Sequence, residues 1–170
     1  MNIRGLPLSR EKICSLASIV RKQCGVGNNL YFPVVQVIEW GLCGSDEFNY
    51  IIVPDDEMRD IYGTTNTAEN IMKIREDVYI GAINGNTRDR FTLCHELGHY
   101  LLHQPQLISY ARGNVPIYCQ PEWQANTFAA EIMAPHNLIV GLSVEEISDK
   151  CGISYSAAKI QQKFAKKIAS

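Results

Sequence analysis

The sequence predicts an α+β fold in which a small antiparallel or mixed sheet is followed by helices. Three observations carry this prediction: a strand-like stretch at residues 48–53 and two helical runs, at about 88–103 and about 121–134. The chain has 170 residues, of which 46% are hydrophobic and 20% charged. This composition is typical of a globular protein, and we expect a single domain over residues 1–170.

The N-terminal part combines helix and strand signals. Ser9 is expected to cap a helix that ends at the glycine- and asparagine-rich run 25–29. Residues 34–42 follow a proline and combine β-branched side chains with helical spacing, and a helix is favoured there. Residues 48–53 (FNYIIV) form the clearest strand, because β-branched and aromatic residues are followed by a Pro-Asp-Asp stop.

The middle of the chain leads from this strand into the first long helix. Residues 58–69 are expected to be an irregular connection and residues 70–74 a short strand. Residues 78–83 fit either a strand or a short helix. The asparagine or threonine at 86–87 can cap the long helix, and Pro105 prevents its continuation.

The first long helix carries the pattern His95-Glu96-x-x-His99. Residues four apart share one face of a helix, so both imidazoles can reach the same metal ion. Glu96 lies about 100° further round the helix, beside the metal rather than on it. There it can accept a proton from water, which is the base role in zinc peptidases. The pattern therefore predicts a Zn²⁺ site with Glu96 as the catalytic residue.

A catalytic zinc ion usually takes three protein ligands, so a third side chain is required. His103 lies on the same helix but roughly 12 Å along its axis from the first histidine. Cys119 has no partner cysteine, and Glu131 follows an apolar face and is expected to be a solvated carboxylate. Glu122 is favoured, because Asn126 lies four residues further on, where its side chain can hydrogen-bond the far nitrogen of a liganding histidine.

The two motif-bearing runs, RDRFTLCHELGHYLLH and EWQANTFAAEIMAP, resemble the ImmA/IrrE family of metallo-endopeptidases. The resemblance covers residues 88–135, with one departure: a cysteine precedes the first histidine, where the family commonly has alanine. It implies a zincin-like fold in which His95 and His99 bind zinc. It further implies that Glu96 is the base and Glu122 the third ligand. The implied substrate is another protein, typically a helix-turn-helix repressor of a mobile element or a stress regulon.

A group besides the metal must stabilise the tetrahedral oxyanion of peptide hydrolysis. The residue types able to do so are Tyr79, Arg88, Arg90, Tyr100, His103, Tyr110 and His136. The sequence does not choose among them. The strand or loop before the motif helix is expected to offer an edge to which an extended peptide adds.

Residues 143–168 have the outline of a helix-turn-helix-like subdomain. Ser143 and Glu146 form a capping box, and Gly152 separates two expected helices. Four lysines make the second of these helices basic, as a DNA-facing helix would be. Because this helix has no arginine for base readout, a packed helical hairpin is favoured over direct DNA binding.

The remaining features favour a cytoplasmic protein. The N-terminus lacks the apolar run of a signal peptide, and no stretch reaches the ~20 apolar residues of a membrane span. The net charge of −2 indicates no particular partner. The six cysteines are scattered without a C-x-x-C pair, so reduced thiols are expected.

Two functions follow from these observations. The leading one is a zinc-dependent cytoplasmic endopeptidase that hydrolyses a peptide bond in a partner protein. The alternative is a non-catalytic, metal-stabilised regulatory module that binds DNA or a repressor. Glu96 separates the two, because a structural zinc site is closed and needs no base.

Overall fold

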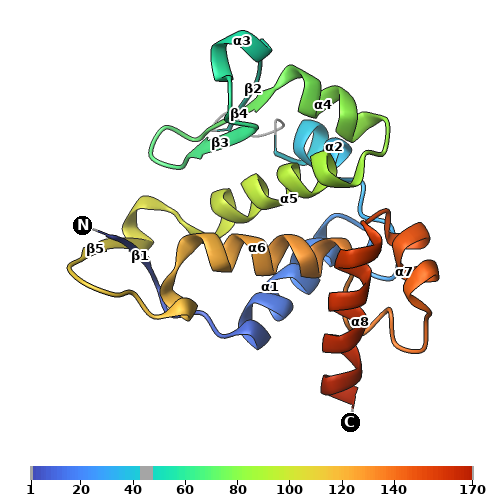
Figure 1. Ribbon diagram of the computed structural model, residues 1–170. Coiled ribbons are helices and arrows are strands. Elements are labelled where there is room, and N and C mark those ends of the chain that lie inside the picture. The colour runs from blue at the N-terminus through green and yellow to red at the C-terminus, as the bar shows by residue number, and fades with distance from the viewer. Residues whose placement is uncertain (1, 43–47, 170) are drawn as a thin grey trace.

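The computed structural model describes residues 2–42 and 48–169 and has the predicted α+β architecture (Figure 1). The helices are α1 (Arg10–Gln23), α2 (Val34–Gln36), α3 (Asp55–Met58), α4 (Glu76–Ile83), α5 (Thr87–Leu102), α6 (Pro121–Met133), α7 (Val144–Cys151) and α8 (Tyr155–Ala169). Single turns lie at η1 (Val37–Leu42, a π-helical turn), η2 (Pro105–Leu107) and η3 (Ile117–Cys119).

The strands form two small sheets. In the first, β4 (Ile71–Arg75) lies between β2 (Asn49–Val53), to which it is parallel, and β3 (Gly63–Asn66), to which it is antiparallel. This sheet is mixed, as predicted. In the second, β1 (Asn2–Gly5) pairs antiparallel with β5 (Ile108–Ala111).

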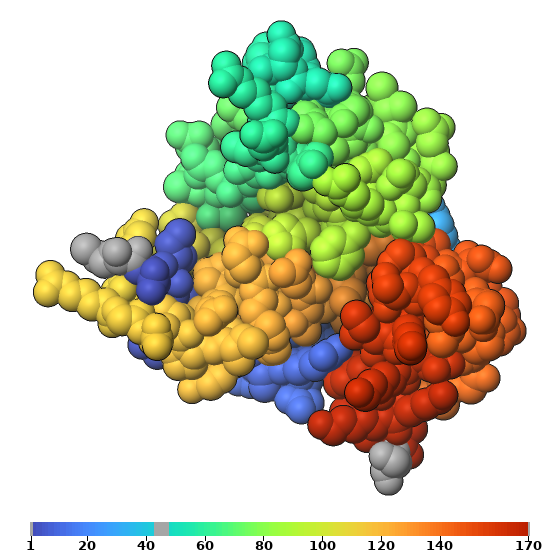
Figure 2. Space-filling model, viewed as in Figure 1, coloured from blue at the N-terminus to red at the C-terminus, as the bar shows by residue number. Residues whose placement is uncertain are grey.

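The helices are arranged around α5. In Figure 1 the three-stranded sheet, α3 and α4 lie on one side of α5, while α6 and α1 lie on the other. The space-filling view shows the same order, with the green segment that carries the sheet above the gold segment that carries α6 (Figure 2). This arrangement places α5, which carries the metal-binding pattern, between the sheet and α6.

Several predicted elements are confirmed. The Ser9 side chain caps α1 by accepting a hydrogen bond from the backbone N–H of Lys12 at 3.3 Å. Residues 34–42 are helical, first as α2 and then as the turn η1. The ambiguous stretch before the motif helix is a helix, α4, and the cap of α5 is Asn86, whose side chain accepts from two backbone N–H groups. The capping box at Ser143 is also present.

Other parts of the sequence-based prediction are wrong. The stretch 58–69 contains the strand β3, whose Thr64 and Thr65 pair with β4. Its residues alternate between exposed and half-buried positions, so the strand lacks the apolar signal that the prediction required. The strands β1 and β5 were not predicted either, because most of their residues are exposed and they pair across more than a hundred residues of chain.

The C-terminal helices contribute to the same core as the rest of the chain. Ile147, Cys151 and Ala158 belong to one buried cluster with Ile13 of α1 and Phe128 of α6. The described cysteines are free thiols, as expected, and Cys43 lies outside the described residues. Among the described helices, none combines the length and the apolar character that crossing a bilayer requires.

Candidate metal centre and catalytic base

Three of the predicted side chains converge at the face of α5 that meets the start of α6. The Nε2 atoms of His95 and His99 lie 3.0 Å apart. Each also lies 3.3 Å from a carboxylate oxygen of Glu122, Oε2 for His95 and Oε1 for His99. Metal–ligand bonds of ~2.0–2.1 Å in a tetrahedral site place neighbouring ligand atoms about 3.3 Å apart. The three groups therefore fit one ion of zinc size.

The close approach of α6 to α5 depends on a glycine inside the motif. A Cβ on Gly98 would lie 3.2 Å from both Ala125 Cα and Phe128 Cδ1, so a larger residue would push the helices apart. This contact brings the first turn of α6, with Glu122, opposite the two histidines. The Glu122 side chain is 73% exposed, so the group of three ligands is open on the solvent side. An open position is what a catalytic, rather than a structural, zinc site requires.

The second nitrogen of His95 is held by Asn126, as predicted. His95 Nδ1 lies 2.9 Å from Asn126 Oδ1. The carbonyl oxygen of an amide only accepts hydrogen bonds, so Nδ1 carries the proton and donates it. In neutral His95 the lone pair is then on Nε2, the atom that points at His99 and Glu122.

A longer chain of hydrogen bonds sets the tautomer of His99. The buried side chain of Gln124 donates from Nε2 to the carbonyl oxygens of Leu6 and Tyr118, each at 2.7 Å, so its Oε1 is an acceptor. His103 Nε2, at 2.9 Å, donates to that oxygen, and its Nδ1 must then accept. His99 Nδ1, at 2.9 Å from His103 Nδ1, is the donor, which leaves the lone pair on His99 Nε2.

His99 and His103, the two histidines in this series of hydrogen bonds, are neutral near pH 7. Burial, followed by the charges of His95 and His103, lowers the pKa of His99 to about 3. Burial also lowers the pKa of His103, against the hydrogen bond to Gln124, which raises it. Neutral imidazole is the form that binds a metal ion, so the site is ready to accept one without a change of protonation at His99.

The carboxylate of Glu96 lies beneath the edge strand β3. Glu96 is 6% exposed, and its Oε2 accepts a hydrogen bond of 2.7 Å from the hydroxyl of Thr65. Burial raises the pKa of Glu96 above its usual range, and the hydrogen bond from Thr65 opposes this rise. A carboxylate with a raised pKa is suited to exchange protons near neutral pH.

The other ligand candidates lie outside this group. His103 supports His99 through its ring nitrogen, and Cys119 is fully buried. Glu131 is 3% exposed and lies 2.5 Å from His136 Nδ1, so the expectation that it is a solvated carboxylate is wrong. The helical period placed it after an apolar face, but α6 is covered there by α1 and α8.

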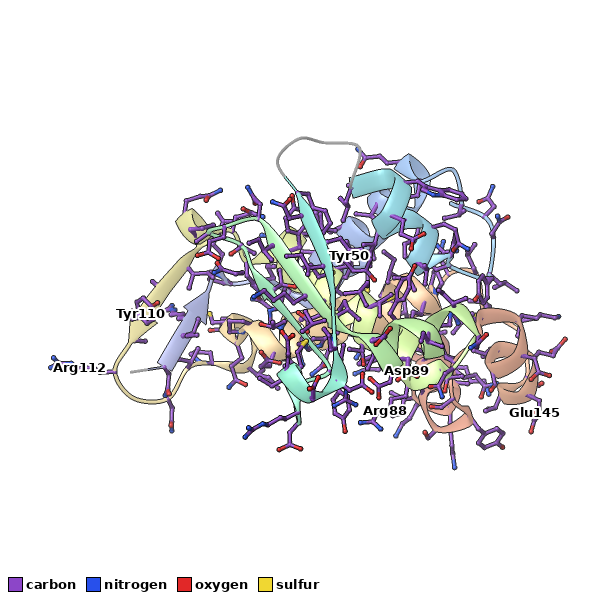
Figure 3. The ribbon with its side chains drawn as sticks, turned by 90° about the horizontal axis from the view of Figure 1, so that it is seen from above. Tyr50, Arg88, Asp89, Tyr110, Arg112 and Glu145 are labelled. Carbon is purple, nitrogen blue, oxygen red and sulfur yellow. The ribbon has the colours of Figure 1, made fainter. Side chains whose placement is uncertain are left out.

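Several side chains considered for the oxyanion are engaged elsewhere. Arg90 is buried and donates to backbone carbonyls of Phe32 and of the turn after α7. Tyr79 donates to Glu39, and His136 pairs with Glu131. The remaining candidates are placed as follows: Arg88 stacks on Tyr62, Tyr100 packs on Phe48, His103 bonds His99, and Tyr110 lies exposed on β5 (Figure 3).

Two contributors to the site carry no recognisable sequence signal. Thr65 comes from a strand that was expected to be irregular, some thirty residues before Glu96, which it contacts. Gln124 lies between the third-ligand candidate Glu122 and Asn126, on the buried side of α6, where a core residue would be expected. Only the tertiary structure brings them to Glu96 and His103.

Comparison with known proteins is consistent with this geometry. Residues 50–160, which is more than half of the chain and includes α5 and α6, match the model of the IrrE N-terminal-like domain, peptidase family M78. No curated protein matches the sequence. The chain therefore belongs to the IrrE N-terminal-like family of metallopeptidases, peptidase family M78.

Proposed function

We propose that this chain is a zinc-dependent endopeptidase in which His95, His99 and Glu122 hold the ion and Glu96 is the general base. The observation that carries the proposal is the spacing of the three ligand atoms, 3.0 to 3.3 Å, on the solvent-open face of α5. Two nitrogen donors and one carboxylate are the donor set of catalytic zinc in peptidases. The hydrogen bonds that fix both imidazole tautomers support the same assignment.

The chemistry divides between the ion and the chain. When bound, zinc supplies Lewis acidity, which polarises the scissile carbonyl and lowers the pKa of the attacking water. Glu96 accepts the proton of that water and later delivers it to the leaving amine. Thr65 keeps the Glu96 carboxylate in one orientation during both transfers. Asn126 and His103 keep the two imidazoles pointed at a common centre.

The substrate is proposed to be a protein segment in extended conformation. Strand β3 is at the edge of its sheet and contacts the base through Thr65, so a peptide added along β3 would pass in front of the site. This arrangement supports a zincin-like assignment. A helix-turn-helix repressor in the cytoplasm is the substrate that the family resemblance favours.

The C-terminal helices are proposed to form a packed helix-turn-helix-like hairpin that does not read DNA. The buried face of α8 consists of Ala158, Gln161 and Ala165, which lie against the core. Gln161 donates to the carbonyl oxygen of Ala134 at 2.8 Å, which ties α8 to the end of α6. The hairpin thus has a structural role that needs no nucleic acid.

The test compares three proteins: wild type, Glu96→Gln and Glu122→Ala. Each is incubated with a candidate helix-turn-helix repressor, and cleavage is followed by mass spectrometry while zinc is measured in the same preparation. We expect wild type to cleave the repressor, Glu96→Gln to keep the zinc ion of this site without cleaving, and Glu122→Ala to lose both the ion of this site and cleavage. Glu69→Gln, which changes an exposed carboxylate that is not one of the proposed ligands or the base, is the matched control and should behave as wild type.

Two results would overturn the proposal. Cleavage by Glu96→Gln at the wild-type rate would remove the base from the mechanism. Relief of repression by wild type and Glu96→Gln alike, without cleavage by either, would assign the chain to the non-catalytic regulatory class.

A further inference from the structure

A second group of metal-ligating side chains lies on the far side of α6 from the candidate peptidase centre. Cys14 of α1, Glu131 of α6 and His136 of the turn after α6 each offer one ligand atom, and these atoms all lie within 4.8 Å of one another. Cys14 and Glu131 are 7% and 3% exposed, while His136 is partly exposed. We call these three residues the Cys14 cluster. None of them belongs to the H-E-x-x-H pattern.

The carboxylate at the centre of the Cys14 cluster is oriented from both sides. Glu131 Oε1 accepts the backbone N–H of His136 at 3.1 Å and lies 2.5 Å from His136 Nδ1. Glu131 Oε2 accepts a hydrogen bond of 3.2 Å from Gln161 Nε2 of α8, and Gln161 is itself 2% exposed. Each carboxylate oxygen has about two lone-pair sites, so Oε2, with one of these bonds, retains a site for a metal ion, whereas Oε1 gains one only when His136 Nδ1 turns to the ion. Such supporting bonds are typical of a carboxylate that serves as a ligand.

A cavity gives the Cys14 cluster access to solvent. Its volume is about 500 Å³, and all three cluster residues line it. Arg21, Lys22 and Glu11 also line the cavity, so two cations and one further carboxylate lie around the cluster. A thiolate and a carboxylate together supply two negative charges, which match one divalent ion despite these neighbours. The cavity has room for an ion and for water as a further ligand.

The same residues are poorly suited to nucleophilic catalysis. Burial and the neighbouring Glu131 raise the pKa of the Cys14 thiol to about 12. A nucleophilic cysteine requires the opposite shift, which a nearby cation or a helix N-terminus produces. The direction of this shift disfavours a thiol–histidine catalytic pair at the Cys14 cluster.

We propose that Cys14, Glu131 and His136 bind a second divalent ion of the zinc class, with water in the cavity completing its coordination. A sulfur, a nitrogen and an oxygen donor select zinc and cobalt over magnesium and calcium, which prefer oxygen alone. Binding replaces the thiol proton, which passes to solvent, by a metal–sulfur bond. Glu131 Oε1 and His136 Nδ1 must then separate from 2.5 Å to about 3.3 Å.

This ion would join the C-terminal helix to the core. The His136 ring packs against Phe164 of α8, with ring centroids 5.3 Å apart. The Arg10 guanidinium of α1 lies over the Phe164 ring, 3.6 Å from its centroid. An ion held by α1, α6 and the turn would fix His136 and, through it, the position of α8. We therefore expect metal binding at the Cys14 cluster to stabilise the hairpin against unfolding.

Cobalt titration of the metal-free protein tests this proposal. A thiolate ligand gives cobalt a strong near-ultraviolet charge-transfer band, which the His95, His99 and Glu122 site cannot produce because it has no sulfur. We expect wild type to bind two equivalents of Co²⁺ per chain. The intensity of the charge-transfer band should correspond to one of these two ions. Cys14→Ser should lose the band and one equivalent. Cys24→Ser, which removes an exposed free thiol outside the cluster, should retain both.

Further variants separate this inference from the proposed peptidase function. His95→Ala should lose one equivalent and all cleavage but keep the full charge-transfer band. Glu131→Gln, which preserves side-chain volume, should lower the Co²⁺ affinity of the Cys14 cluster, followed through the charge-transfer band, at least tenfold. This variant tests the proposal if Cys14→Ser fails to fold. A single equivalent without a band in wild type, or a band that survives Cys14→Ser, would refute the second site and leave the peptidase proposal standing.

Discussion

His103 Nε2 lies 2.9 Å from Gln124 Oε1, and through this bond a buried glutamine sets which nitrogen of His99 is free to bind a metal ion. The order of donors and acceptors begins at two backbone carbonyls, those of Leu6 and Tyr118, which hold the amide group in one orientation. The folded backbone thus sets the tautomer of His99 through the side chains of Gln124 and His103. Such outer contacts commonly change metal affinity by 10- to 100-fold.

The first prediction concerns His103. His103→Leu removes the acceptor for His99 Nδ1, so both tautomers of His99 become populated and zinc affinity should fall about tenfold or more. His103→Gln offers both a donor and an acceptor and should recover part of the loss. Competition with a chromophoric chelator measures the affinity. Gln162→Ala, which removes a hydrogen bond from α8 to the partly buried carbonyl oxygen of Leu142, is the control. Equal zinc affinities for His103→Leu and wild type would show that the hydrogen bond to His103 does not set the tautomer of His99.

The second prediction concerns Thr65. Thr65→Val removes the hydrogen bond that holds the pKa of Glu96 down, so this pKa should rise further. A general base is active when deprotonated, so activity is lost as pH falls through its pKa, and a higher pKa moves that loss to higher pH. We expect the acidic limb of the kcat/KM profile to shift upward, with roughly tenfold lower activity at pH 7 and unchanged zinc content.

Thr64→Val is the matched control for this experiment. Thr64 lies on the same strand, is exposed, and pairs with Lys73 of β4 rather than pointing at the site. Its profile should coincide with that of wild type. A Thr65→Val profile with an unmoved acidic limb would show that the hydroxyl does not act on Glu96.

The sequence predicted the parts of this fold whose signals are local. The helix α5 has a cap, Asn86, an apolar periodicity and a proline beyond its end, and the structure places it within one residue of expectation. The strands β1 and β5 have no such signal, since residues such as Ile3 and Tyr110 are exposed and pair across more than a hundred residues of chain. Pairing over such distances is set by topology, which a single sequence does not display.

The candidate site divides in the same way. His95, Glu96 and His99 follow from spacing on one helix, and Asn126 follows from spacing on the next. Thr65 depends on the packing of β3 against α5, which no local pattern encodes. The burial of Glu131 was missed for the same physical reason: its helix is covered on that side by elements distant in sequence.

The third prediction concerns the pH dependence of the metal-free protein. The pKa of His99 is about 3 in the folded state, against 6.5 for an unperturbed histidine. Between these values the unfolded state binds a proton that the folded state does not. The stability of the fold is therefore intact above about pH 6.5 and falls as pH decreases toward 3, by about 1 kcal/mol per pH unit. Urea denaturation of chelator-treated protein at pH 7.5 and pH 5.5 measures this decline.

Two variants assign that decline to its source. His99→Asn removes the group with the lowered pKa, so its stability should change less between the two pH values than that of wild type. Glu96 acts in the opposite sense, because its raised pKa makes the folded state bind a proton more readily as pH falls toward about 4.5. Glu96→Gln should therefore steepen the decline. Identical pH dependence in wild type and His99→Asn would reject the lowered pKa.

The last prediction concerns the turn between the C-terminal helices, where a glycine and a buried arginine meet. Gly152 ends α7 in the left-handed region, at φ 63°. The Arg90 guanidinium donates to the carbonyl oxygens of Cys151, Gly152 and Phe32, so it ties α5 to this turn through backbone acceptors. A Cβ on Gly152 would lie 2.2 Å from Arg90 Nη1, a separation that forces the guanidinium out of place.

Gly152→Ala should therefore lower the free energy of unfolding for two separate reasons. The left-handed backbone costs an alanine about 1 kcal/mol, and displacing Arg90 from its buried carbonyls costs about 2 kcal/mol more. Gly141→Ala separates them, because Gly141 also has a positive φ, 84°, but no atom within 4 Å of its added Cβ. In chemical denaturation, the free energy of unfolding should fall by about 3 kcal/mol for Gly152→Ala and by about 1 kcal/mol for Gly141→Ala, relative to wild type. Equal losses would mean that the arginine does not hold the turn, because only the backbone contribution is common to both glycines.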